Sequence, residues 1–188
     1  MTTHAISPAH HMRRTRIWLA VFLAGLVVSG LTAFPLETET AWLADLAHRT
    51  SWLPTDVVAW IDRTREGVAV TNAHYPFLAY GTDWLAFAHL TIAAAFWGPL
   101  CDPVRNVWVV QWGLIACAAL VPLALVCGPV RGIPVYWSLI DMSFGFFGAI
   151  PLLFALHHIR ALERAAGAPA QQGPATPPAA NRLTESIN

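Results

Sequence analysis

The amino-acid sequence predicts an all-α integral membrane protein: an antiparallel four-transmembrane-helix bundle with two short amphipathic helices on its outer surface. Hydrophobic residues make up 56% of the 188 residues and charged residues 12%, whereas soluble domains are about 45–50% apolar and about 25% charged. Four long apolar stretches run through the chain, and most charged residues lie outside them. The few charged groups could not cover the surface of a soluble globular domain. We therefore expect the chain to lie in a bilayer.

The charges and the cysteines exclude several other classes of protein. The formal net charge is +0 at pH 7, and the sequence has no dense basic patch, so we expect no nucleic-acid partner. The three cysteines, Cys101, Cys117 and Cys127, form no CxxC motif and are expected at different depths in the bilayer. The sequence therefore predicts neither a disulfide framework nor a zinc ribbon.

The four apolar stretches cover residues 17–36, 84–100, 107–126 and 135–156. A transmembrane helix needs about 20 residues, within a range of about 17–25, and every stretch meets that requirement. Each must be helical, because the bilayer core offers no hydrogen-bond partners to the backbone. The loops joining the last three stretches are short and rich in turn residues, which favours antiparallel neighbours. The membrane domain is therefore expected over residues 17–164.

The placement of arginines predicts the orientation in the membrane. Arg13, Arg14 and Arg16 immediately precede the first stretch, and such flanks favour the cytoplasmic side. We expect a multi-pass protein of the cell membrane, with a cytoplasmic arm over residues 1–16 and a cytoplasmic C-terminus. Residues 165–188 are rich in Ala, Pro and Gln and are expected to form a disordered tail. An alternative interpretation makes the first stretch a cleaved signal peptide.

The segment 37–82 lies outside the membrane on this topology and is more than a plain loop. Residues 39–49 and the residues after Pro54 have apolar side chains at helical spacing, which predicts two amphipathic helices, the second ending near Gly67. Tryptophans suited to headgroup depth occur at three positions in this segment, Trp42, Trp52 and Trp60. We expect the segment to rest on the outer membrane surface above the bundle.

The fourth stretch has a polar and small-residue face. Ser138, Asp141, Gly145 and Gly148 are spaced at i, i+3, i+7 and i+10, which places them on one side of a helix. Glycines let a neighbouring helix come close, so this side is expected to point into the bundle. A carboxylate at the bilayer centre costs about 2.5–3.5 kcal/mol on insertion scales. Asp141 therefore needs a partner, a proton or water.

His89 in the second stretch is the predicted partner of Asp141. His89 lies about 7.5 Å below the outer boundary at Trp84, and Asp141 lies about 6 Å below Trp137, at 1.5 Å per residue. Both helices enter from the outer side, so the depths match and we expect a hydrogen bond between His89 and Asp141. Such a pair is either a polar contact between helices or part of a functional site, because intramembrane ionisable residues are usually functional.

Further polar and aromatic residues are expected at the same level. The predicted ligand pocket also contains Thr32, His74, Tyr75, Tyr80, Asp83 and Ser138. His74, Asp83, His89 and Asp141 could supply imidazole and carboxylate ligands to zinc or iron, although no HExxH motif is present. Neither a metal nor another cofactor can be named from the sequence.

Two functions from different classes follow from this pocket. The first is a membrane protein with an outward-facing His/Asp pocket that binds a lipid, a small ligand or a partner membrane protein. The second is a small membrane-embedded enzyme that uses His89 and Asp141 as an acid–base pair or as part of a metal site. The expected partners are the lipid bilayer and either another membrane protein or a second copy of the chain.

Overall fold

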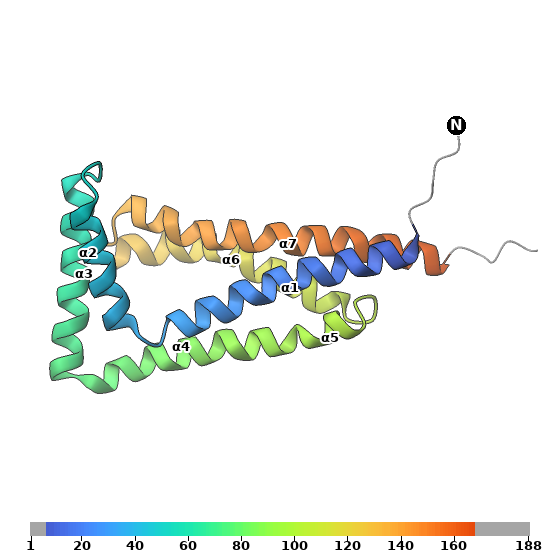
Figure 1. The fold of residues 1–188 in the computed structure, drawn as a ribbon, viewed down its shortest axis with the longest axis horizontal. Helices are drawn as coiled ribbons and strands as arrows, with labels where there is room; N and C mark the ends of the chain where they lie inside the picture. Colours follow the sequence, from blue (N-terminus) through green and yellow to red (C-terminus); the bar gives the residue numbers. More distant parts are fainter. Residues whose placement is uncertain (1–6, 168–188) are drawn as a thin grey trace, which may run out of the picture.

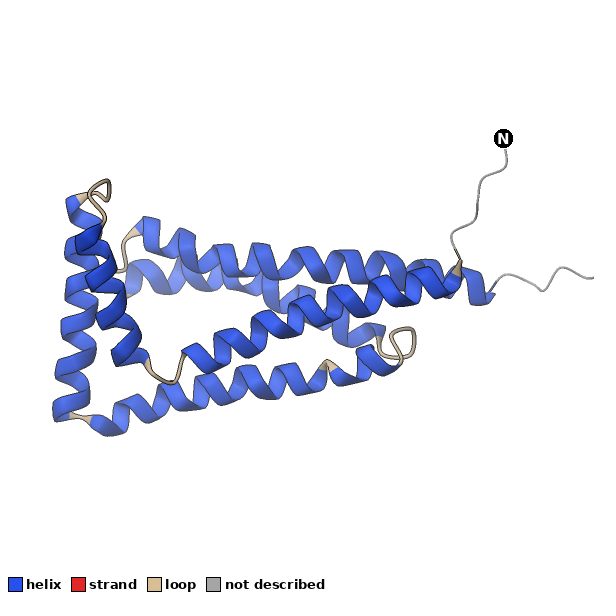
Figure 2. Ribbon diagram, viewed as in Figure 1, coloured by secondary structure: helices blue, strands red, loops and turns tan. Residues whose placement is uncertain are grey.

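The computed structural model describes residues 7–167, and within that range it contains helices and no strands (Figure 2). Four helical segments are long and apolar enough to cross a membrane, which confirms the four predicted spans by length and composition. They are α1 (Pro8–Thr32), α4 with α5 (Pro76–Ala95 and Trp97–Cys101), α6 (Val107–Val130) and α7 (Val135–Gly167). Most of the predicted tail, residues 168–188, and residues 1–6 of the predicted arm lie outside the described residues.

Several helices begin earlier or end later than the sequence predicts. The helix α1 begins at Pro8, so it includes most of the predicted cytoplasmic arm, and α4 begins at Pro76 rather than at residue 84. The second helix predicted in the segment 37–82 does not end near Gly67 but continues to His74. Its stop is set by Pro76, because a proline disfavours helical backbone in the residue before it.

Two shorter helices cross one end of the four long ones. These are α2 (Leu36–Arg49) and α3 (Thr55–His74), which pack against each other and stand across the helix ends (Figure 1). We call this end of the molecule the platform end, and the opposite end, near Pro8 and Gly167, the terminal end. In Figure 1, α1 and α6 run toward the platform end, and α4 and α7 run away from it.

The long helices pack as two pairs that glycines bring together. Gly30 of α1 faces α4, where an added Cβ would lie 3.1 Å from the Ala86 carbonyl oxygen. Gly145 of α7 faces α6, where an added Cβ would lie 2.5 Å from the Cys117 carbonyl oxygen. Small residues at such contacts let helix backbones approach closely, which is how helices associate in lipid. We therefore group the long helices by these glycine contacts into two pairs, α1 with α4 and α6 with α7, and α1 in addition packs extensively against α7.

The two pairs meet in the half of the molecule near the terminal end. The buried hydrophobic core lies there, and α1 packs against α7 as it crosses it (Figure 1). Its fully buried side chains include Leu19, Phe96, Val110, Leu152 and Ile159. Toward the platform end, α1 diverges from α7, so the core does not continue between the pairs.

A second, smaller core joins α2 and α3 to the platform end of α7. Ala44, Ala47 and Ile61 are buried between the two short helices, and Trp137 of α7 packs against them. The Tyr136 hydroxyl donates to the Asp56 carbonyl oxygen at 3.4 Å. At its other end α3 leads directly into α4 through Tyr75. The helix α3 therefore spans the platform end from the start of α7 to the start of α4.

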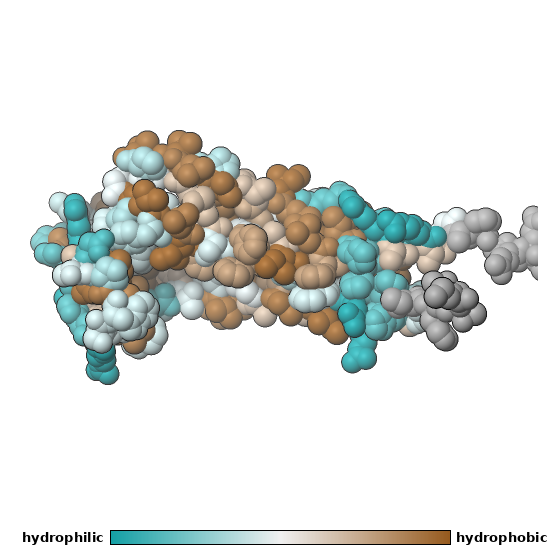
Figure 3. Space-filling model, turned by 90° about the horizontal axis from the view of Figure 1, so that it is seen from above, coloured by the Kyte–Doolittle hydropathy of each residue, from teal (hydrophilic) through white to brown (hydrophobic). Residues whose placement is uncertain are grey.

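The distribution of polar and apolar residues over the molecular surface is the one that a bilayer requires. On the face shown in Figure 3, hydrophobic residues cover the middle of the molecule, and hydrophilic residues gather at the two ends. Large apolar side chains such as Phe87, Leu125 and Phe146 are well exposed around the long helices. Apolar surface of this extent is unusual for a soluble monomer and is typical of a surface that contacts lipid.

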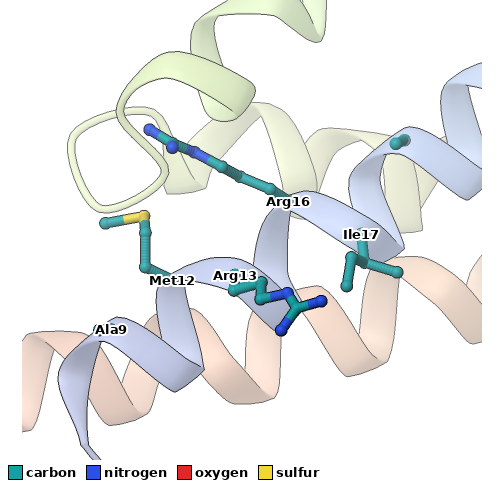
Figure 4. A pocket seen from close by; sticks show the side chains of 6 residues that line it. Ala9, Met12, Arg13, Arg16 and Ile17 are labelled. Atoms are coloured by element: carbon teal, nitrogen blue, oxygen red, sulfur yellow. The ribbon is translucent and has the colours of Figure 1, made fainter.

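Arg16 ties α1 to the end of α5. Its Nε donates to the Leu100 carbonyl oxygen at 3.1 Å, and its Nη2 donates to the Cys101 carbonyl oxygen at 3.4 Å. Figure 4 shows Arg16 extending from α1 toward this end, whereas Arg13 points another way. The last carbonyl groups of a helix lack intrahelical partners, so a guanidinium there satisfies them and opposes the negative end of the helix dipole.

A histidine pair joins α1 and α7 at the terminal end. The Nδ1 atoms of His11 and His158 lie 3.0 Å apart. His158 is about 35 Å from the start of α7 at 1.5 Å per residue, beyond a bilayer core of about 30 Å. Burial lowers the pKa of His158 from its ordinary value, and the neighbouring His11 and His157 lower that pKa further. The contact between the helices is therefore built for neutral imidazoles.

We predict that Arg16→Gln lowers the stability of the protein more than Arg13→Gln does. Both arginines are exposed and lie on the first turns of α1, so the two changes remove the same charge from the same region. Only Arg16→Gln removes hydrogen bonds to the end of α5. Their loss should lower the free energy of unfolding by about 1 kcal/mol. Unfolding by sodium dodecyl sulfate in mixed micelles measures the difference, and equal losses from the two variants would contradict the capping role.

We predict that acidification weakens the α1–α7 contact. Because the pKa of His158 is lowered in the folded state, the unfolded chain binds more protons as the pH falls below the ordinary histidine pKa of about 6.5. The stabilisation is complete above that pH and is lost below it. His158→Gln should reduce the dependence of unfolding on pH between 7 and 5, whereas His74→Gln, in an exposed side chain of α3, should not. An unchanged pH dependence in the first variant would disprove the assignment.

Candidate functional site

A large cavity lies between the two helix pairs. Its volume is about 830 Å³, within the range of about 300–1,000 Å³ that is usual for ligand pockets. Its lining comes from all four long helices, including Phe22 and Gly25 of α1, Ile92 of α4, Trp112 and Leu120 of α6, and Phe147 of α7. We call this cavity the groove. Every lining residue belongs to a long helix or is Phe96, so α2 and α3 do not roof the groove as the sequence suggested.

The groove opens on the apolar surface of the molecule. Val21, Phe144 and Phe147 line it, yet 52%, 66% and 66% of these side chains respectively remain exposed. The opening follows from the packing, because α4 and α6 have no extended interface within residues 7–167 and α1 diverges from α7. A molecule could therefore enter from the side rather than from the end of the helices.

Polar groups in the groove gather at one level. Among the residues that line it, Ser29, His89 and Asp141 are each the one nearest the platform end on their own helix, namely α1, α4 and α7. Toward the terminal end the lining is almost wholly aliphatic and aromatic for about 15 Å, the rise of α7 from Asp141 to Pro151. The groove is thus polar at one end and apolar along the rest of its length.

His89 is held by its own helix in a defined orientation. Its Nδ1 lies 2.8 Å from the Leu85 carbonyl oxygen, one turn earlier in α4. A carbonyl oxygen cannot donate, so Nδ1 carries the proton in this hydrogen bond. In a neutral imidazole, the remaining nitrogen Nε2 then has a free lone pair. The contact of His89 Cβ with the position above Gly30 places this residue at the α1–α4 interface.

Asp141 lies where the groove meets a second, smaller cavity. That cavity, of about 300 Å³, lies between α6 and α7 and is lined by both Ser138 and Asp141. Within residues 7–167 the Asp141 carboxyl group makes no hydrogen bond with a protein group. The predicted inward direction of Asp141 agrees with this position, because its side chain lines space inside the helix group.

The expected hydrogen bond between His89 and Asp141 is not formed. Both residues line the groove, as their matching depths suggested. However, no hydrogen bond joins the two side chains in the described part of the chain, and the one hydrogen bond of the His89 ring there goes to Leu85. The Leu85 carbonyl oxygen lies one turn away on the same helix and accepts from Nδ1–H. A neutral His89 ring then has no second N–H to donate to Asp141.

The other residues predicted for the pocket lie elsewhere. His74 Nδ1 donates to the Val70 carbonyl oxygen at 2.9 Å, and Tyr75 and Tyr80 are exposed near the start of α4. Thr32 donates to the Ser29 carbonyl oxygen at 3.2 Å. None of these residues lines the groove, and Asp83 does not line it either.

The structure does not gather the four candidate metal ligands. His89 and Asp141 both line the groove, but His74 and Asp83 line neither the groove nor the smaller cavity. Across residues 7–167, no group of three or more His, Cys, Asp and Glu side chains is close enough to hold a metal ion.

Sequence reasoning missed part of the groove. Gly25 and Ser29, which lie four residues apart on one side of α1, both line the groove and were not among the residues predicted for the pocket. An added Cβ at Gly25 would meet nothing within 4 Å. The aromatic lining at Trp18, Phe144 and Phe147 gave no signal, because apolar aromatic residues are common throughout all four stretches.

A further hollow beside α1 is not comparable to the groove. Its volume is about 440 Å³, and the six residues that line it, including Arg13 and Arg16, all belong to α1 (Figure 4). A hollow lined by one helix is a surface depression between side chains. The groove, by contrast, brings together residues from four helices that are far apart in the sequence.

Comparison of the chain with protein-family models, with curated proteins and with solved structures finds no match. The groove and its polar end are therefore interpreted from their own geometry.

Proposed function

We propose that the four long helices form an antiparallel transmembrane bundle with the platform end outside the cell and both termini in the cytoplasm. The apolar middle of the surface and the hydrophilic ends support this placement (Figure 3). The terminal end has Arg13, Arg14 and Arg16 on α1 and Arg160 and Arg164 on α7, as the positive-inside rule requires. The helices α2 and α3 then lie on the outer surface as amphipathic elements.

Within this bundle, we propose that the groove binds an amphiphilic molecule that enters from the outer half of the bilayer. The observation that carries this function is the division of the groove into a polar end at Ser29, His89 and Asp141 and a long apolar remainder. An amphiphile has the same division, with a polar head and an apolar chain. Its head would lie near the platform end, where lipid head groups of the outer leaflet also lie.

A binding function fits the contacts better than an acid–base enzyme does. General acid–base catalysis by the pair would call for Asp141 to orient the His89 imidazole. The imidazole is instead oriented by the Leu85 carbonyl oxygen. The serine hydroxyl groups that flank Asp141 in the sequence of α7, at Ser138 and Ser143, are also not hydrogen-bonded to His89 among the described residues.

We predict that Gly25→Phe blocks the groove without disturbing the helix contacts. The space above Gly25 is empty to 4 Å, and Gly25 faces the groove, so the new ring would occupy the volume of the apolar chain. Gly81→Phe is the matched control, because Gly81 of α4 also has open space above it but does not line the groove. Both changes replace a helical glycine, so their effects on helix propensity are alike.

The measurement is photolabelling of the purified protein in phosphatidylcholine vesicles with a trace of a diazirine-bearing long-chain lipid. Peptide mapping should show saturable labelling of groove residues such as Phe144, reduced at least tenfold in Gly25→Phe and unchanged in Gly81→Phe. Labelling spread evenly over lipid-facing residues such as Phe87 and Leu125, and equal in both variants, would refute the binding function.

A further inference from the structure

Each of the three polar side chains at the polar end of the groove can accept a hydrogen bond. Nε2 of a neutral His89 accepts, because its Nδ1 proton is already given to Leu85. When ionised, Asp141 accepts through both carboxylate oxygens, and the Ser29 hydroxyl can accept as well as donate. In the described part of the chain, none of these three acceptors is hydrogen-bonded to a protein donor. A ligand that donates several hydrogen bonds therefore suits this end of the groove.

The groove also has an unbalanced charge. Asp141 is the one acidic residue in its lining, and that lining contains no arginine. An ionised carboxylate in a low-dielectric site is costly unless it is paired. A cation with several N–H groups would satisfy both requirements, since it would neutralise Asp141 and still have N–H groups to donate to other acceptors at this end of the groove.

We infer that the occupant of the groove is a single-chain amphiphile with a primary ammonium head. A primary ammonium has one positive charge and three N–H donors, which suit the Asp141 carboxylate and the two further acceptors, His89 and Ser29, that line the same end of the groove. The inference rests on the proposed function and names the chemical class of its ligand. Phe144 lies about one turn along α7 from Asp141 and also lines the groove, so an aromatic ring is available near the same cation.

The absence of arginine from the lining also limits the rest of the ligand. An aminophospholipid has an ammonium group, but its phosphate would enter the same region with a negative charge. Phosphate sites in proteins use arginine, lysine or helix N-termini, and the lining offers none of these, because the polar end lies inside the helices rather than at their starts. The ammonium head is therefore attached to the apolar chain without a phosphate.

The test compares competitors with the same chain and different heads in the photolabelling of the wild-type protein at pH 7. Dodecylamine has charge and N–H donors, dodecyltrimethylammonium has charge without N–H donors, and dodecanol has one O–H donor without charge. Dodecylamine should displace the label at a concentration at least tenfold lower than either of the others. Adding phosphatidylethanolamine to the vesicles should displace the label no better than phosphatidylcholine.

A pair of asparagine variants locates the effect at one carboxylate. Asp141→Asn should reduce the advantage of dodecylamine over dodecanol at least tenfold, because the amide keeps the shape and removes the charge. Asp83→Asn makes the same chemical change in α4 outside the groove and should leave the advantage intact. If Asp141→Asn does not fold, two other measurements still test the ammonium head. These are the competitor series on the wild-type protein and the variant His89→Ala, in which the advantage of dodecylamine over dodecanol should fall at least threefold.

Each failure has a distinct meaning. Equal displacement by dodecanol would overturn the ammonium head in favour of an alcohol, and equal displacement by dodecyltrimethylammonium would show that the N–H donors are not recognised. Strong displacement by phosphatidylethanolamine would overturn the exclusion of phosphate. In all three cases, if Gly25→Phe still reduces the labelling of groove residues, the proposed binding function stands. If Gly25→Phe leaves that labelling unchanged, both the binding function and the ammonium head are refuted.

Discussion

The packing of Phe96 onto Gly113 is the contact on which the arrangement of the long helices depends. Phe96 stands between α4 and α5 and is fully buried. An added Cβ at Gly113 of α6 would lie 2.8 Å from its ring and 2.9 Å from Leu152 of α7. One missing side chain thus lets three helices meet at one level. No comparable contact is present between α4 and α6 nearer the platform end within the described residues, so the helices separate there.

This distribution of packing leaves polar groups unsatisfied in a place where that is costly. In lipid, helices gain little from hiding apolar surface, so close packing and hydrogen bonds hold them together. The glycine contacts at Gly30 and Gly145 provide the packing, but the hydrogen-bonding capacity of Asp141 is not used by the protein. A bound head group would supply the missing hydrogen bonds. Binding to the folded form alone would also stabilise that form by mass action, so the proposed binding function would link occupancy to stability.

The sequence predicts the large features of this fold well. Length and apolar composition locate the four spans, because a helix is the form in which a single segment satisfies its own backbone in lipid. Helical spacing also places Asp141 inward, since Gly145 and Gly148 on the same face mark the side where another helix approaches. Rise per residue brings His89 to a similar depth, and the structure puts both residues in one groove.

The finer features depend on contacts that a sequence does not display. The His89 ring donates to the Leu85 carbonyl oxygen of its own helix, and the spacing of polar residues cannot reveal that this acceptor is used instead of Asp141. The residues between 68 and 82 resemble a loop because they combine polar and aromatic residues, yet Pro76 divides them into the end of one helix and the start of another. Gly25 faces empty space while Gly30 faces a neighbouring backbone, a difference set by the crossing of α1 over its partners.

The helix α3 acts as a spacer of fixed length between the two pairs. It begins beside Tyr136 of α7 and ends at Tyr75, where α4 starts, and its 20 residues measure about 30 Å. Each residue inserted in a helix advances its end by about 1.5 Å and also turns it by about 100°. A single insertion would therefore swing α4 out of register with α1, and two whole turns, or about seven residues, are needed to restore the direction. The width of the groove can thus change in evolution by large steps, with small adjustments left to the side chains that line it.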